Sequence, residues 1–179
     1  AADAVDGGSA TEADPGLGDE TNEVDADLVA AGEALYRRSC VTCHGVDGTG
    51  QSTPGGQVRG PSLVRSGAAG ASYQLTTGRM PLASPGDLPT RKPPVFDDAE
   101  IDALVAYVAS LGDGPAVPDV DASAGDLALG GELYRANCQA CHSATGAGGA
   151  LSYGRAAPPL AAATPTEIGA AVRSGPGPM

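Results

Sequence analysis

Apolar residues recur at helical spacing early in the chain, the pattern typical of a helix with one buried face. Asp25 or Asp27 can cap the start of this helix through its carboxylate. The recurring positions are Leu28, Gly32, Leu35, Tyr36 and Ser39. The pattern therefore predicts a helix that contains residues 28–39.

A second helical pattern follows the Gly- and Pro-rich segment 45–96, for which we expect mostly loop and one short helix around residues 71–77. Asp97 stands at an N-cap position with Glu100 three residues later, which is the sequence form of a capping box. Gly112 is expected to end this helix. Its apolar stripe consists of Ile101, Leu104, Val105, Val108 and Leu111, with Tyr107 beside it.

The first helical pattern occurs twice, because residues 32–44 recur as residues 130–142 at an offset of 98. In both copies a glycine and a tyrosine four residues apart share one helix face, and Ser123 or Asp126 can cap the second helix. Glycine within a helix costs about 1 kcal/mol relative to alanine, so we expect another helix to approach each glycine closely. Repetition over this length indicates two copies of one domain rather than a solenoid.

Charge divides the chain in the same way. The net charge of -12 comes from two acidic segments, residues 1–27 with -9 and residues 113–126 with -4, whereas the parts between and after them carry 0 and +1. Acidic segments rich in Gly, Ala and Pro bury too little apolar surface to offset the entropy of ordering them. The expected parts are an acidic flexible tail (1–24), a first domain (25–112), an acidic, flexible Pro/Gly linker (113–125) and a second domain (126–179).

The acidic balance also argues against nucleic acid as a partner, because phosphates need Lys and Arg. No apolar run approaches the roughly 18–20 residues that span a bilayer.

Every cysteine and every histidine of the chain lies in one of two Cys-x-x-Cys-His motifs. The motifs are Cys40-Val41-Thr42-Cys43-His44 and Cys138-Gln139-Ala140-Cys141-His142. Two thiols three residues apart at a helix end can form thioethers with the two vinyl groups of one haem, and the adjacent imidazole can bind its iron. This is the attachment signature of c-type haem, so we predict two covalently bound haems and an extracytoplasmic compartment, because attachment follows export.

Other uses of paired cysteines fit less well. The Cys-x-x-Cys pairs of zinc sites are usually about 12–20 residues apart, whereas 94 residues lie between Cys43 and Cys138. Neither structural disulfides nor a thiol redox motif would need a histidine after each pair.

The two methionines occupy equivalent places in the two copies. Met80 lies 36 residues after His44, and Met179 lies 37 residues after His142. A methionine often fills gaps in a core, but that role would not place both at matching positions. We therefore predict that Met80 and Met179 are the second axial ligands of the two haem irons, the His/Met pattern of cytochromes c.

Pro61 has a counterpart in Pro158-Pro159. A backbone carbonyl at this position could accept the Nδ1 proton of the neighbouring histidine and orient its ring. A rigid turn is the other role that proline suggests here, and the two roles are compatible.

The Gly32/Tyr36 face and the Leu104/Tyr107 face resemble the crossed first and last helices of class I cytochrome c, an all-α fold. Four more motifs resemble the dihaem cytochrome c subunit (cytochrome cc) of the actinobacterial cytochrome bc1 complex, over about residues 28–179. They are Gly-Arg-Met-Pro (78–81), Arg-Lys-Pro-Pro-Val-Phe (91–96), Gly-Gly-Ala-Leu-Ser (148–152) and Gly-Pro-Gly-Pro-Met (175–179). We therefore expect two tandem class I cytochrome c-like domains.

The second domain is expected to stop short of its closing helix. Gly112 lies 68 residues after His44, and the same reach from His142 extends about 31 residues beyond Met179. The helix that would face Gly130 belongs to this missing part.

The resemblance implies an electron-transfer subunit on the extracytoplasmic face of the cell membrane, held by a C-terminal transmembrane anchor that is absent from this sequence. It implies that the first haem takes electrons from a Rieske iron–sulfur protein, which works beside cytochrome b. The second would pass them to the copper centre of an aa3-type oxidase. The chain would then belong to a quinol–cytochrome c reductase, with no substrate chemistry and no catalytic residue of its own. Two alternatives are a free dihaem shuttle similar to cytochrome c4 and a dihaem peroxidase, which needs one iron with an open position.

Overall fold

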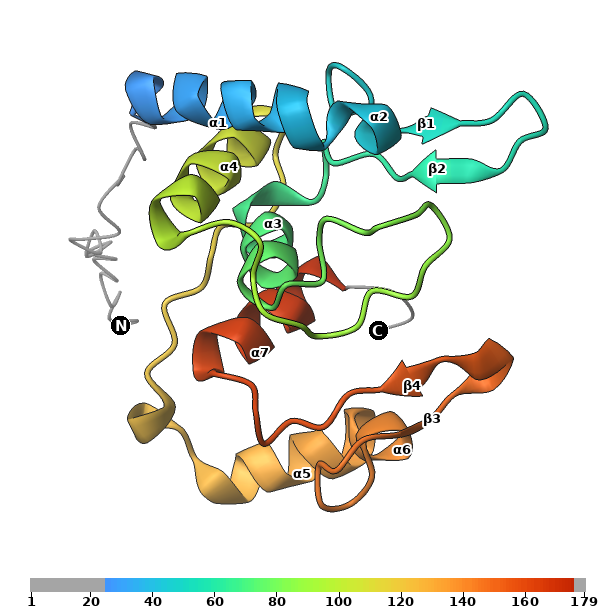
Figure 1. The fold of residues 1–179 in the computed structure, drawn as a ribbon. Helices are drawn as coiled ribbons and strands as arrows, with labels where there is room; N and C mark the ends of the chain where they lie inside the picture. Colours follow the sequence, from blue (N-terminus) through green and yellow to red (C-terminus); the bar gives the residue numbers. More distant parts are fainter. Residues whose placement is uncertain (1–24, 176–179) are drawn as a thin grey trace, which may run out of the picture.

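The computed structural model describes residues 25–175, which are mostly helical (Figure 1). The first half contains α1 (Ala26–Ser39), α2 (Val41–His44), β1 (Gln51–Ser52), β2 (Val58–Gly60), α3 (Gly67–Thr76) and α4 (Asp98–Ser110). The second half contains the 3-10 turn η1 (Ala122–Ala124), α5 (Leu127–Asn137), α6 (Gln139–His142), β3 (Gly149–Ala150), the 3-10 turn η2 (Ser152–Gly154), β4 (Ala156–Ala157) and α7 (Pro165–Ser174). The strands form two short antiparallel hairpins, β1–β2 and β3–β4, that helical periodicity did not predict.

The helix starts follow the predicted caps. The Asp25 carboxylate accepts from the first backbone N–H groups of α1, and the Asp126 carboxylate does the same for α5. Asp97 and Glu100 form the predicted capping box of α4. Helix α3 begins at Gly67 rather than near residue 71. Its Gly- and Ala-rich first turns carry no clear periodicity, and they are helical because they are buried against other helices.

The core of the first half lies where α1 crosses α4. Tyr36 is fully buried, and its ring centroid lies 5.0 Å from that of Tyr107. A Cβ added to Gly32 would lie 1.9 Å from the carbonyl oxygen of Ala103, so only glycine fits there. This confirms the expected close approach of a second helix to Gly32.

Helix α5 has no such partner in the part of the chain that the structure describes. Leu127 is 93% exposed, and Leu129 and Leu133 are more than half exposed. A Cβ added to Gly130 would meet nothing within 4 Å. The face that α1 buries is therefore open to solvent on α5.

Helix α7 of the second half packs on α3 of the first half (Figure 1). Small residues allow this contact: Ala170 and Ala171 are buried, and a Cβ added to Gly70 would lie 3.5 Å from Cβ of Ser174. An ion pair joins the halves beside it, with Nη2 of Arg91 2.5 Å from Oε2 of Glu167.

The connection between the halves, for which its composition predicted a flexible linker, contacts α3 and α7. The backbone N–H of Ala69 in α3 donates to the carbonyl of Pro115 at 2.9 Å. Pro118 is buried, and a Cβ added to Gly169 would lie 2.9 Å from both Pro118 and Val120. Residues 115–120 therefore pack closely in the structure, because small residues of α3 and α7 let this backbone approach, while the flexibility of the linker stays a prediction.

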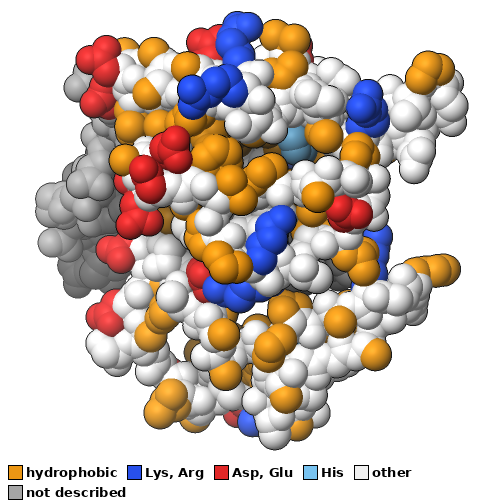
Figure 2. Space-filling view, viewed as in Figure 1, with side chains coloured by type: hydrophobic (Ala, Val, Ile, Leu, Met, Phe, Trp, Pro, Cys, Tyr) orange, Lys and Arg blue, Asp and Glu red, His pale blue; other side chains and the backbone are white. Residues whose placement is uncertain are grey.

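On the face shown in Figure 2, acidic side chains gather near α1 and α4, whereas the part over α5 shows mostly hydrophobic and uncharged side chains. No helix within residues 25–175 has the length and apolar character needed to cross a membrane. The predicted tail, residues 1–24, and the end of the chain, residues 176–179, lie outside the described residues.

Candidate haem-binding sites

One cavity in the first half brings together four of the predicted site residues, Cys40, Cys43, His44 and Met80. The other lining residues, most of them apolar, are Ser39, Arg59, Gly60, Pro61, Leu75, Pro81, Leu82, Pro85 and Phe96. Two thiols, an imidazole and a thioether in an apolar cavity are the groups that a c-type haem needs for attachment and ligation. The residues present therefore fit a haem, while iron ligation by His44 and Met80 stays a prediction.

The attachment turn forms where α1 ends. The backbone N–H of Cys40 donates to the backbone carbonyl of Tyr36 at 2.8 Å, and the backbone N–H of His44 donates to the carbonyl of Cys40 at 2.9 Å. The second half repeats both bonds at the same lengths, from Cys138 and His142. Burial, and secondarily the nearby Cys43, raises the pKa of the Cys40 thiol to about 11. The thiol is thus protonated near neutral pH before attachment.

A proline carbonyl orients each histidine, as the sequence predicted. Nδ1 of His44 lies 2.8 Å from the carbonyl oxygen of Pro61, and Nδ1 of His142 lies 2.9 Å from that of Pro158. A carbonyl only accepts hydrogen bonds, so Nδ1 carries the proton in each ring. Nε2 then keeps its lone pair for the iron.

Two tyrosines position these turns in a way that the sequence analysis missed. The hydroxyl of Tyr36 donates to the carbonyl of Gly45 at 2.6 Å, and the hydroxyl of Tyr134 donates to that of Ser143 at 2.6 Å. Burial raises the pKa of Tyr36 to about 12, so the hydroxyl remains a donor throughout the physiological range. The signal was present, since each tyrosine precedes its histidine by eight residues.

The loop that carries Met80 is held on both sides. Met80 N–H donates to the carbonyl of Gln74 at 3.1 Å. Lys92 N–H donates to the carbonyl of Thr77 at 3.2 Å, and its ammonium donates to the carbonyl of Pro81 at 3.0 Å. The segment around Lys92, which the sequence analysis quoted only as a family motif, therefore supports the predicted methionine ligand.

The second site is described only in part. His142 is buried, and it follows Cys138 and Cys141 in the same turn as in the first half. Met179 lies outside the described residues, so its role as a ligand stays a prediction.

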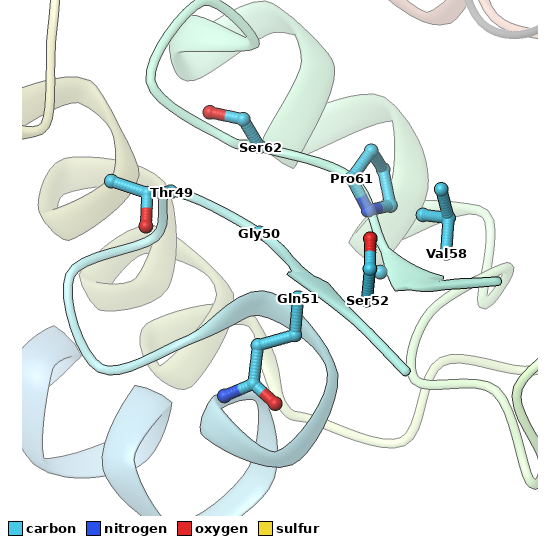
Figure 3. Close-up of a pocket in the computed structure, with 8 residues that line it drawn as sticks. Thr49, Gly50, Gln51, Ser52, Val58, Pro61 and Ser62 are labelled. Carbon is cyan, nitrogen blue, oxygen red and sulfur yellow. The ribbon is translucent and has the colours of Figure 1, made fainter. Parts of the chain in front are cut away.

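Two other observations bear on alternative sites. Figure 3 shows a separate depression beside β1 and β2, lined by Thr49, Gly50, Gln51, Ser52, Val58, Gly60, Pro61 and Ser62. It contains no titratable side chain and offers no redox or acid–base chemistry. Within residues 25–175, no three or more His, Cys, Asp or Glu side chains are grouped so as to hold a metal ion.

Comparison with known proteins finds a cytochrome family model for each half of the chain. The family model described as cytochrome c matches residues 29–112, and the model described as cytochrome c oxidase, cbb3-type, subunit III matches residues 125–179.

Three relatives carry the name cytochrome bc1 complex cytochrome c subunit. The protein from Mycobacterium tuberculosis is 42% identical over 163 residues, covering 87% of this chain and 56% of its own length. The protein from Mycobacterium leprae is 40% identical over 157 residues, which cover 83% of this chain and 53% of that protein. The protein from Corynebacterium diphtheriae is 36% identical over 166 residues, which cover 83% of this chain and 57% of that protein.

The chain therefore contains cytochrome c domains and is similar to these cytochrome c subunits. It carries two covalently bound c-type haems, one for each cytochrome c domain. It spans about half the length of the curated relatives that it matches.

Proposed function

We propose that this chain is the dihaem electron-transfer subunit of a quinol-oxidising respiratory complex of the bc1 type. The observation that carries the proposal is its 36–42% identity, over 83–87% of its length, to proteins named as the cytochrome c subunit of that complex. In this role the chain is part of a quinol–cytochrome c reductase and has no substrate chemistry of its own.

In the proposed path, the first domain receives electrons from a Rieske iron–sulfur protein that works beside cytochrome b. The second domain delivers them to the copper centre of an aa3-type oxidase. Both partners would meet the chain on the extracytoplasmic face of the cell membrane, where c-type haem is attached. A C-terminal anchor outside this sequence would hold it there.

Each haem supplies one-electron chemistry through its iron, and the protein provides the setting. The carbonyls of Pro61 and Pro158 fix the histidine rings. Apolar residues such as Leu75 and Phe96 line the first cavity and limit the access of water. The packing of α7 on α3 holds the two domains as a pair, which favours transfer within the chain over independent docking of each domain.

The charge distribution supports fixed partners over a mobile shuttle. Residues 28–112 carry no net charge and residues 127–179 carry +1. A diffusing carrier commonly uses a strongly charged docking face to speed its encounters. Two nearly neutral domains would attract a partner only weakly over long distances.

The open face of α5 supports a further helix that completes the second domain. Gly32 is covered by α4, whereas the equivalent Gly130 meets no atom within 4 Å and Leu127 is exposed. A closing helix equivalent to α4 would bury this face. It would lie beyond Met179, in the half of the relatives' length that this chain does not span.

Affinity purification from native membranes in mild detergent tests the proposal. The chain should recover cytochrome b, the Rieske protein and the terminal oxidase, and the preparation should oxidise quinol with oxygen as the acceptor. A matched purification in high salt should recover the same set, because the complex does not depend on long-range charge attraction.

Two results would overturn the proposal. Recovery of the chain alone, with electron transfer that slows steeply with salt, would indicate a free shuttle. High-spin bands in the spectrum of the oxidised protein, with peroxide turnover, would indicate a peroxidase.

A further inference from the structure

Arg79 is a buried cation without an anionic partner among residues 25–175. Its relative exposure is 7%, and Nη1 is buried with no hydrogen-bond acceptor. The ion pairs of the described residues join Arg37 to Glu33 and Arg91 to Glu167, and neither involves Arg79. Burying a charge without compensation costs several kcal/mol, so a guanidinium in this position is expected to have a counter-ion.

The protein groups around Arg79 do not supply that counter-ion. Its Cζ lies 4.8 Å from the ring centroid of Tyr73, a cation–π contact that offsets only part of the cost of burying the charge. Gln74 Oε1 is another buried atom without a partner, but a neutral amide would not neutralise the charge. The missing group is therefore an anion, and planar guanidinium favours a carboxylate.

Arg79 is next in sequence to a residue of the first haem cavity. It directly precedes Met80, which lines the cavity that holds Cys40, Cys43 and His44. Tyr73, on which it stacks, lies one turn after Gly70, where α3 meets α7 of the second domain. The guanidinium of Arg79 thus stacks on the helix that meets the second domain, and its backbone leads directly into the first haem cavity. Each haem brings two carboxylates, and these are the anions that the chain acquires when it is loaded.

We infer that Arg79 binds a haem carboxylate. The carboxylate belongs to the haem of the first domain or to that of the second, and the guanidinium offers paired N–H donors to either. The bond neutralises part of the negative charge near the iron. It therefore raises the potential of that haem by disfavouring the extra positive charge of the oxidised state. The inference rests on the bound haems and not on the proposed partners.

Redox titration of the haem-loaded protein, with the two haems followed separately, tests this. Arg79→Gln should change the ratio of reduced to oxidised iron at one haem about tenfold toward the oxidised form, which is about 59 mV for one electron. Arg79→Lys keeps the positive charge, so the potential of that haem should stay close to its value in the unaltered protein. Arg65→Gln removes an exposed arginine before α3 and should change neither haem more than twofold.

The low-spin spectrum must stay intact in Arg79→Gln, because a purely structural role would instead release Met80 or unfold the domain. Should Arg79→Gln fail to fold, a high-resolution structure of the unaltered haem-loaded protein decides the matter. A carboxylate oxygen about 2.7–2.9 Å from the guanidinium supports the inference and identifies which haem is bound. Unchanged potentials at both haems, or no haem carboxylate within 4 Å of Arg79, would overturn it. Neither result depends on whether the chain purifies with a respiratory complex.

Discussion

At the scale of single residues, the position after each haem-binding histidine shows the tightest backbone constraint. Gly45 has φ 82° and ψ 163°, and Ser143 has φ 64° and ψ 167°. This combination is nearly restricted to glycine. Tyr36 and Tyr134 hydrogen-bond the carbonyls of these two residues, so both turns are held in the same conformation although only one has the residue suited to it.

Replacing Ser143 by glycine should therefore stabilise the second domain by about 1 kcal/mol. The variant relieves strain of roughly 1–3 kcal/mol. It loses two hydrogen bonds of Ser143 Oγ, one from the N–H of Ala147 at 3.1 Å and a long one with Thr145 Oγ1 at 3.4 Å, which together contribute about 1 kcal/mol. Denaturant unfolding of the haem-loaded protein measures the difference. Gly45→Ser is the reverse substitution at the equivalent position and should destabilise the first domain. A lower denaturant midpoint for Ser143→Gly than for the unaltered protein would contradict backbone strain at Ser143.

Met80 is the predicted second axial ligand of the first haem iron. Met80→Ala should open the sixth position of that iron, lower its potential and allow carbon monoxide to bind, because the thioether stabilises reduced iron and blocks the site. Met179→Ala is the matched variant for the second haem. Optical spectra with and without carbon monoxide, together with redox titration, provide the measurement. An unchanged potential and low-spin spectrum in either variant would rule out that methionine as a ligand.

At the scale of elements, α1 and α5 begin alike in sequence but differ in their surroundings. Both are capped by an aspartate and both carry a glycine four residues before a tyrosine. Helix α4 packs against Gly32, whereas nothing covers Gly130 in the described chain. Gly32 thus allows close packing of α1 on α4, whereas the equivalent Gly130 only lowers the helix propensity of α5.

A matched pair of alanine variants should show this difference. Gly32→Ala places a Cβ against the backbone of Ala103 and should destabilise the first domain by about 2–3 kcal/mol, as overpacking does. Gly130→Ala should stabilise the second domain of this chain by about 1 kcal/mol, the helix propensity difference. Thermal unfolding of both variants gives the comparison. In a longer chain with the proposed closing helix, Gly130→Ala should instead destabilise, and stabilisation there would refute that helix.

At the scale of the whole molecule, the two domains are joined by helix packing and by charge. Helix α7 packs on α3, and Pro118 of the connection is buried. The Arg91 side chain is 38% exposed and that of Glu167 only 12% exposed, so their ion pair is screened less than a fully exposed one. The same Glu167 carboxylate also completes the capping box of α7 with Thr164.

A double-mutant cycle isolates the interdomain pair. Arg91→Gln, Glu167→Gln and the double variant should give a coupling of about 1 kcal/mol, near the upper end for partly exposed pairs. Gln can also complete a capping box, and the cycle cancels any change in it because Glu167→Gln is present in both the single and the double variant. The Glu33–Arg37 pair on α1 is the control, with an expected coupling of about 0.3–0.5 kcal/mol. Zero coupling between Arg91 and Glu167 would mean that the domains do not hold this arrangement in solution.

The sequence predicted the parts of the molecule whose causes are local. The Asp25 and Asp97 caps and the haem-attachment turns depend on hydrogen bonds within about one helical turn. The histidine–proline bonds reach across 16–17 residues, and repetition of the motif revealed them. The start of α3 could not be predicted, because a run of Gly and Ala has little helical preference until neighbours bury it.

By itself, therefore, the sequence determined that the chain has two copies of one helical haem-binding unit, with thiols, imidazoles and methionines at matching positions. Only the tertiary structure decided that α7 lies on α3, that residues 115–120 are packed, and that Arg79 is buried. The physical reason is that these contacts join surfaces of small residues far apart in the chain. Their fit depends on shape, and neither hydrophobic periodicity nor composition records shape.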